Sequence, residues 1–201
     1  MATSPADDLS SGTSSLPSRA TSMARTLVAY YSRTGHTRDV AGEIASIIGT
    51  DVDIEEILEE SDRPGALGWI RCAFEAMFRL RPALRAGRDV HGYDVVFVGG
   101  PIWMGRLAPA VRAFVEQHIG RETRVAYFAT QEGAPTDAAW HDLEALSPAR
   151  PVACHSIRNG AVPQAVRRAE LERFVARAQR GQPATADERA TSASSSRHAH
   201  G

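Results

Sequence analysis

The chain has 201 residues and a formal net charge of -1, so it carries no basic excess of the kind that binds nucleic acid. All 23 basic residues are arginine. The lack of lysine excludes Walker-type phosphate loops, pyridoxal phosphate enzymes and other Schiff-base mechanisms. Two cysteines, Cys72 and Cys154, are too few for a disulfide scaffold and favour a reducing cytoplasm.

The two ends of the chain differ from its centre in composition. Residues 1–22 and 181–201 are small and polar, and we expect both to be disordered tails around one domain at residues 23–180. Met23, directly before the first apolar run, is an alternative start. The N-terminus lacks the apolar core of a signal peptide, and no apolar run approaches the roughly 20 residues of a membrane helix. We therefore expect a cytoplasmic protein without a membrane span.

Short apolar runs alternate with helical patterns between the tails, which is typical of βαβ units in a parallel sheet. Unbroken apolar runs indicate central strands that are buried on both faces, whereas the alternating pattern of Val52–Ile57 indicates an edge strand. The predicted strands are Leu27–Tyr31, Val52–Ile57, Val95–Val98, Val125–Phe128 and Val152–Cys154.

Apolar residues at helical spacing predict helices between these strands. Their apolar stripes consist of Val40, Ile44, Ile47 and Ile48; Leu107, Val111, Phe114 and Val115; Trp140, Leu143 and Leu146 after the possible cap Thr136; and Leu171, Phe174, Val175 and Ala178. Because crossovers between parallel strands are right-handed, this order predicts an α/β fold, a three-layer doubly wound sandwich around a five-stranded parallel sheet. Such folds bind ligands beyond the carboxyl ends of their strands.

A long stretch from Glu59 to Gly92 separates the second and third predicted strands. It carries Leu67, Ile70 and Phe74 at helical spacing among arginines, and we interpret it as an amphipathic helix. A core-packed crossover with a solvated arginine face is the plainer interpretation. A lid, a dimer contact and attraction to anionic lipid are the alternatives.

The loop after the first strand leads straight into a helix. Its hydroxyl groups and the unpaired N–H groups of the helix start converge where the helix dipole favours an anion. Ordinary capping is the plainer explanation for Ser and Thr at a helix start. Capping uses one hydroxyl, however, and this loop has three beside a glycine that permits positive φ. The predicted phosphate-binding residues are Ser32, Arg33, Thr34, Gly35, His36 and Thr37, with His36 contributing its amide.

Two further loops follow the third and fourth strands at the same edge of the sheet. The first places Trp103 between glycines and a proline, where its indole can clamp a flat ring or fill the seam between loop and sheet. The second offers polar groups for the rim of such a ring. The candidate residues are Pro101, Ile102, Trp103, Met104 and Gly105 in the first loop, and Thr130, Gln131, Glu132 and Gly133 in the second.

Together these loops resemble those of the flavodoxin family. The matching motifs are Ser/Thr-x-Thr-Gly-x-Thr and Gly-x-Pro-x-Trp-x-Gly, followed by Leu-Ala-Pro, and the resemblance covers residues 26 to about 178. It implies strand order 2-1-3-4-5, noncovalent FMN binding and electron transfer. Ser32–Thr37 would hold the FMN phosphate, the other two loops would flank the isoalloxazine, and Trp103 would stack on it. The Met104–Gly105 peptide would flip beside the flavin N5 atom.

The chain departs from that family in charge and in its third loop. Typical flavodoxins are strongly acidic and carry an aromatic residue where this chain has Gln131 and Glu132, so one flavin face is expected to be open. An open face favours an alternative function, an FMN-dependent NAD(P)H:quinone-type oxidoreductase. A non-redox interaction module on the same fold is a further alternative. The expected partners are a redox protein, a nicotinamide or a quinone, for a monomer or a homodimer; no metal site and no catalytic side chain is predicted.

Overall fold

A computed structural model describes residues 25–60, 82–133, 135–160 and 162–181. The predicted tails, apart from Gly181, and residues 61–81 of the Glu59–Gly92 stretch lie outside these residues, as does Cys72. Within the described part, no helix combines the length and apolar character needed to cross a membrane. In chain order the elements are β1 (Thr26–Tyr30), α1 (His36–Ile48), β2 (Val52–Glu56), the short 3-10 helix η1 (Val90–Gly92), β3 (Val95–Trp103), β4 (Arg106–Leu107), α3 (Pro109–His118), β5 (Val125–Gln131), α4 (Asp137–Leu146), β6 (Ala153–Arg158) and α5 (Gln164–Arg180).

The sheet has the order β2-β1-β3-β5-β6, with all four pairings parallel. This order confirms the predicted doubly wound topology, and β2 lies at the edge as its alternating pattern predicts. Every residue of β1 and β5 is buried, which explains the unbroken apolar runs of these central strands. The two-residue strand β4 pairs antiparallel with the end of β3 and was not predicted.

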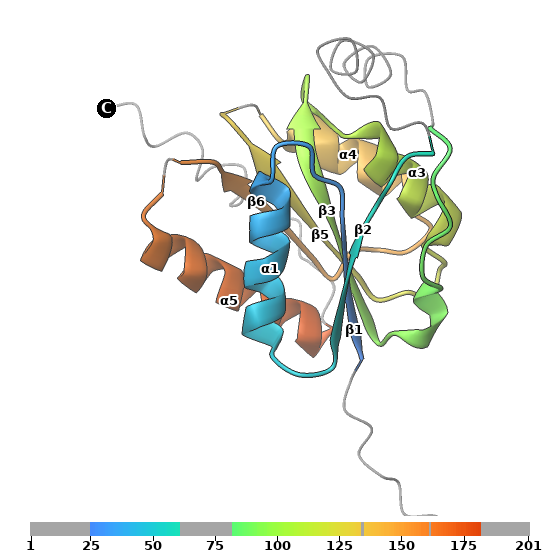
Figure 1. Cartoon of the computed structure of the whole chain (residues 1–201), viewed down its shortest axis with the longest axis horizontal. Helices are drawn as coiled ribbons and strands as arrows, with labels where there is room; N and C mark the ends of the chain where they lie inside the picture. Colours follow the sequence, from blue (N-terminus) through green and yellow to red (C-terminus); the bar gives the residue numbers. More distant parts are fainter. Residues whose placement is uncertain (1–24, 61–81, 134, 161, 182–201) are drawn as a thin grey trace, which may run out of the picture.

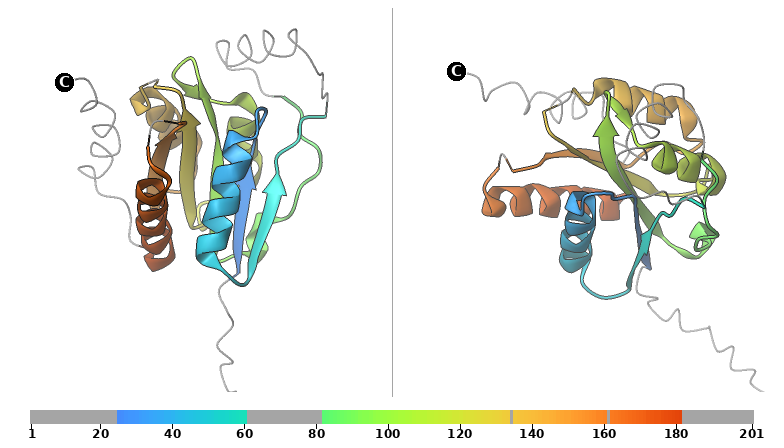
Figure 2. Two further views of the ribbon diagram at one scale, coloured as in Figure 1. Left: turned by 60° about the vertical axis from the view of Figure 1, so that its left-hand side comes forward. Right: turned by 45° about the horizontal axis from the view of Figure 1, so that its top comes forward.

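In the described part of the chain, helices cover both faces of the sheet: α3 and α4 pack on one face, and α1 and α5 on the other (Figures 1 and 2). Side chains of successive β1 residues enter opposite layers: Leu27 and Ala29 pack with residues of α3 and α4. Val28 and Tyr30 pack with residues of α1 and α5. The predicted apolar stripe of the last helix is buried in this second layer, which confirms that part of the helix prediction.

The third strand is longer than its apolar run predicts. Gly99, Gly100 and Pro101, expected in a loop, continue β3 and pair with β5. A Cβ atom on Gly99 would lie 2.3 Å from the ring of Phe128, and one on Gly100 would lie 2.4 Å from Val111. The two glycines are therefore required by close packing on β5 and α3.

Two further boundaries differ from the prediction, and one helix begins where predicted but lacks the expected cap hydrogen bond. Leu107 belongs to β4, and α3 begins only at Pro109, because the residue before a proline avoids the helical conformation. Thr136 occupies the N-cap position of α4, but its buried hydroxyl forms no cap hydrogen bond. The last strand extends to Arg158, well beyond the predicted Cys154.

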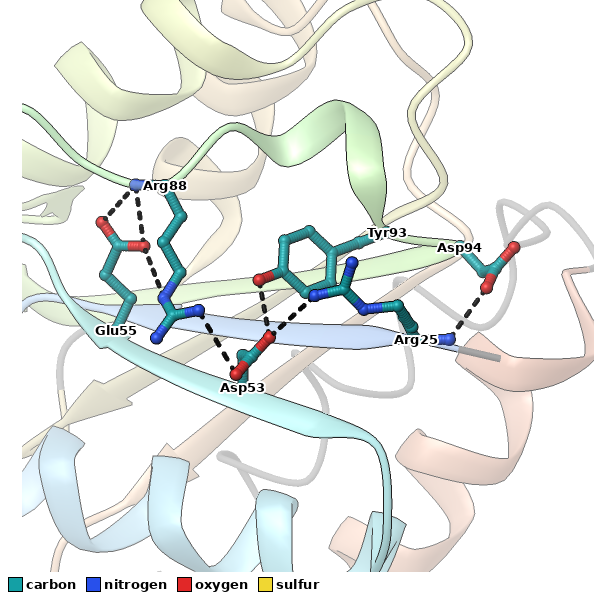
Figure 3. Close-up of polar contacts among 6 residues, drawn as sticks. All are labelled: Arg25, Asp53, Glu55, Arg88, Tyr93 and Asp94. Atoms are coloured by element: carbon teal, nitrogen blue, oxygen red, sulfur yellow. Dashed lines mark hydrogen bonds and ion pairs between the residues drawn. The ribbon is translucent and has the colours of Figure 1, made fainter. Parts of the chain in front are cut away.

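A polar cluster fastens the segment before β3 to the edge strand β2 (Figure 3). Arg88 donates its backbone N–H to the Glu55 carboxylate at 3.0 Å and forms an ion pair with Asp53 at 3.3 Å. The Tyr93 hydroxyl donates to Asp53 at 2.7 Å, and this bond lowers the pKa of that carboxyl with help from Arg88. The segment that leads into β3 is thus tied to β2 over residues 88–93.

Candidate functional site

The carboxyl ends of β1, β3, β5 and β6, together with the residues that follow them, line one cavity of about 600 Å³ at this edge of the sheet. This volume lies within the roughly 300–1,000 Å³ typical of small-molecule sites. Its position beyond the strand ends is where doubly wound folds bind ligands. The lining residues are Arg33, Thr34, His36, Thr37, Pro101, Ile102, Trp103, Thr130, Gln131, Glu132 and Asn159.

The loop between β1 and α1 forms the polar end of the cavity. Gly35 precedes the helix with φ at 93°, and its N–H donates to the Ser32 hydroxyl at 3.2 Å. No side chain caps α1 at this position. Thr34 and His36 are exposed and line the cavity, so the first-turn N–H groups and the Thr34 hydroxyl border the same space. This arrangement suits an anion.

A buried contact joins this loop to the neighbouring strand. The Thr37 and Thr130 hydroxyl oxygens lie 2.8 Å apart, and both residues are 2% exposed. Each hydroxyl therefore satisfies the other in a place that water does not reach. The contact fixes the start of α1 against the end of β5, and it gives Thr37 a structural role in addition to its place in the cavity wall.

Trp103 forms the apolar side of the cavity from the end of β3. Its half-buried ring meets Tyr31 edge to face, with ring centroids 5.9 Å apart and an interplanar angle of 81°. The chain then turns through Met104 and Gly105, whose φ values of 52° and 73° are those of a two-residue type I′ hairpin into β4. Met104 is 69% exposed at the tip.

Part of the cavity wall that was predicted as a loop after the fourth strand belongs to β5 itself. Thr130 and Gln131 belong to the strand and are buried, and the Gln131 side chain accepts a hydrogen bond from the Gly133 N–H. Glu132 is exposed at the rim. Among the described lining residues, Glu132 is the acidic one, and the same cavity is also lined by Arg33 and His36.

Asn159 lines the cavity and was missed by the sequence prediction. It directly follows β6, and its N–H donates to the Gln131 carbonyl at 2.9 Å. The polar residues His155 and Ser156 interrupt the apolar pattern of β6, so the predicted strand ends too early, at Cys154. The rule that ligands bind at carboxyl strand ends would have found Asn159 had the end of β6 been placed correctly.

The remaining predicted residues shape turns and do not line the cavity: Ser32, Gly35, Met104, Gly105 and Gly133. Gly133 has φ of 110°, so it shares with Gly35 and Gly105 a left-handed conformation that favours glycine. Arg38, which follows Thr37 in α1, donates hydrogen bonds to the Tyr30 hydroxyl and, at 2.8 Å, to the Glu56 carboxylate. These two hydrogen bonds raise the pKa of Arg38.

Similar proteins include two curated relatives described as NAD(P)H dehydrogenase (quinone). The protein from Azorhizobium caulinodans is 32% identical over 103 residues, covering 49% of this chain and 48% of the relative. The one from Caulobacter vibrioides is 33% identical over 122 residues, with 58% of each covered. The chain thus matches only about half of the length of these relatives.

Solved structures share the fold over nearly their whole length. A protein from Bacteroides eggerthii described as a flavoprotein matches with a TM-score of 0.61 at 25% identity, over 76% of this chain and 98% of that one. A flavoprotein from Lactobacillus acidophilus, solved in complex with FMN, matches with a TM-score of 0.59 at 20% identity, over 76% and 99%. The family model described as flavodoxin matches residues 25–176, well over half of the chain, and the protein therefore belongs to the flavodoxin family.

Proposed function

We propose that the protein binds FMN noncovalently in the cavity at the carboxyl edge of the sheet and transfers electrons. The observation that carries this proposal is the convergence of the three predicted loops on one space, with an anion-binding helix start at one side and Trp103 at the other. Membership in the flavodoxin family and the FMN complex of the Lactobacillus acidophilus protein support it.

The residues present fit the chemical groups of FMN. The first turn of α1 and the Thr34 hydroxyl suit the phosphate, because both offer hydrogen-bond donors in a place where a helix dipole favours negative charge. Trp103 and Ile102 offer apolar surface to the ring system. The side chains and backbone of Gln131 and Asn159 offer polar groups to its edges. Bound FMN supplies the redox chemistry, and these residues bind and orient it.

A second candidate function is an FMN-dependent NAD(P)H:quinone-type oxidoreductase. The names of the two curated relatives favour it. The described cavity residues at the end of β5 and directly after it are Thr130, Gln131 and exposed Glu132, none of them aromatic, and this also favours it. A nicotinamide or quinone would then be the small-molecule partner. A redox protein as partner, the monomer or homodimer, and the cytoplasmic location stay predictions.

The experiment is an anaerobic titration of the FMN-reconstituted protein with NADH and NADPH, followed by its visible spectrum. Fast bleaching of bound flavin supports the oxidoreductase, whereas bound flavin that stays oxidised supports a carrier reduced by another protein. A chain that retains no FMN after mixing and gel filtration contradicts both and favours the interaction module.

A further inference from the structure

An ion pair ties the cavity-lining hairpin of β3 and β4 to a helix. Arg106 pairs with Trp103 across the hairpin, and its guanidinium contacts the Asp142 carboxylate on α4. The Arg106 and Asp142 side chains are 29% and 14% exposed. Partial burial makes such a pair stronger than one in open solvent, because water screens it less. Arg106 itself does not line the cavity.

The hairpin has little internal support. β4 contributes only two residues, Arg106 and Leu107, and both turn residues between the strands have positive φ. Its base is held by buried Leu107 and by the Ala108 N–H, which donates to the Pro101 carbonyl at 3.0 Å. The end nearer to Trp103 is held from one side by the ring of Tyr31 and from another by the Arg106–Asp142 pair.

We propose that the Arg106–Asp142 ion pair positions the Trp103–Gly105 turn for flavin binding, which makes Arg106 and Asp142 positioning residues. This inference rests on the proposed FMN site. A turn held in its binding conformation loses less entropy when the ring binds beside it, so the pair raises affinity without touching the ligand. Loss of either partner removes this link between the hairpin and α4 and releases the turn.

The first test is a double-mutant cycle with Arg106→Gln, Asp142→Asn and the double variant, each titrated with FMN by flavin fluorescence. Residues that act as one unit give non-additive effects. We expect each single substitution to weaken FMN binding by roughly tenfold, the double variant to bind no more weakly than the weaker single variant, and Arg106→Lys to restore part of the affinity. Additive losses, or unchanged affinity in both single variants, would overturn the proposal.

A matched control lies on the opposite face of the sheet. Arg167 on α5 forms an ion pair with Glu43 on α1, and these side chains are 28% and 23% exposed. Arg167→Gln therefore removes a comparable bridge between two elements at a distance from the hairpin. We expect FMN affinity to stay within about twofold of the parent. An equal loss in this control would assign the effect of Arg106 to general destabilisation and overturn the proposal.

A second readout needs no flavin. Amide hydrogen exchange of residues 102–108 in the FMN-free protein should become at least several-fold faster in Arg106→Gln and stay unchanged in Arg167→Gln. Unchanged exchange in Arg106→Gln would overturn the positioning role. If the parent binds no FMN while exchange responds as expected, the proposed function fails, but the Arg106–Asp142 pair still holds the turn. Failure of the proposed function and failure of the positioning role are therefore distinguishable.

Discussion

Thr34 and Thr37 differ in their surroundings although the sequence pattern treats them alike. The Thr34 side chain is exposed and borders the cavity, whereas Thr37 is buried against Thr130 with the hydroxyl oxygens 2.8 Å apart. Removal of the Thr37 hydroxyl would leave that of Thr130 without this partner in the interior. Thr34 is therefore the cleaner probe of ligand binding, since its substitution leaves the packing of α1 on β5 intact.

We predict that Thr34→Ala weakens FMN binding by roughly 10- to 100-fold, because a hydrogen bond to a charged group contributes about 1.5–3 kcal/mol. Riboflavin lacks the phosphate, so its affinity should be unchanged. Isothermal titration of parent and variant with both ligands checks this. A parallel loss for FMN and riboflavin would place the phosphate elsewhere.

At the scale of single residues, the sequence predicts local backbone features better than it predicts contacts. The glycine before α1 has the positive φ that its residue type permits, because that conformation is a local property, whereas phosphate binding at this loop stays a prediction. The contact of Thr37 with Thr130 joins residues 93 positions apart, and the edge-to-face packing of Tyr31 on Trp103 depends on strand pairing. Such long-range contacts have no local signature.

At the scale of elements, the pairing of β3 with β5 depends on Gly99. A Cβ at this position would meet the Phe128 ring at 2.3 Å, a separation that side chains do not tolerate. We predict that Gly99→Ala destabilises the protein by about 1–3 kcal/mol through overpacking, as measured by urea unfolding. Gly42→Ala in α1 is the control, because its added Cβ meets nothing within 4 Å beyond its chain neighbours and the backbone of its own helix, and alanine favours helices.

The same packing predicts coupling between the two positions. In Gly99→Ala with Phe128→Leu, the smaller side chain makes room for the new methyl group, so the double variant should be more stable than the sum of the single losses implies. Strictly additive losses would mean that the Phe128 ring moves aside freely, and would contradict the close fit.

Element identities were predicted well where the burial of an element is uniform. The central strands β1 and β5 are buried throughout, and their apolar runs reveal them. The ends of β3 and β6 were placed too early, because Gly99, Gly100 and Pro101 suggest a turn and the partly exposed His155 and Ser156 interrupt the apolar pattern. Only the neighbouring strand reveals that these residues continue the sheet.

At the scale of the whole molecule, one histidine couples stability to pH. His155 on β6 packs against Phe174 of α5 with ring centroids 5.7 Å apart, and its Nε2 is buried without a hydrogen-bond partner, 4.0 Å from the Glu170 carboxylate. Burial lowers the pKa of His155 to about 4, and Arg173 adds to this effect. Between pH 6.5 and 4 the unfolded chain therefore binds a proton that the folded chain does not.

We predict that stability falls as the pH drops through this window, by up to about 3 kcal/mol from this residue, and that His155→Phe removes that part of the loss. Urea unfolding of parent and variant at pH 7 and pH 4.5 measures it. The parent should lose more stability than the variant on acidification. Equal losses in both proteins would show that the folded protein accepts a proton at His155 without cost.

The site is a property of the whole sheet, since its walls come from the ends of β1, β3, β5 and β6 and meet only through the order β2-β1-β3-β5-β6. A crystal structure of the chain grown with FMN would show whether this cavity is the flavin site. We expect the phosphate at the first turn of α1 and the isoalloxazine beside Trp103. A flavin bound at another surface, or a cavity that stays empty at saturating FMN, would contradict it.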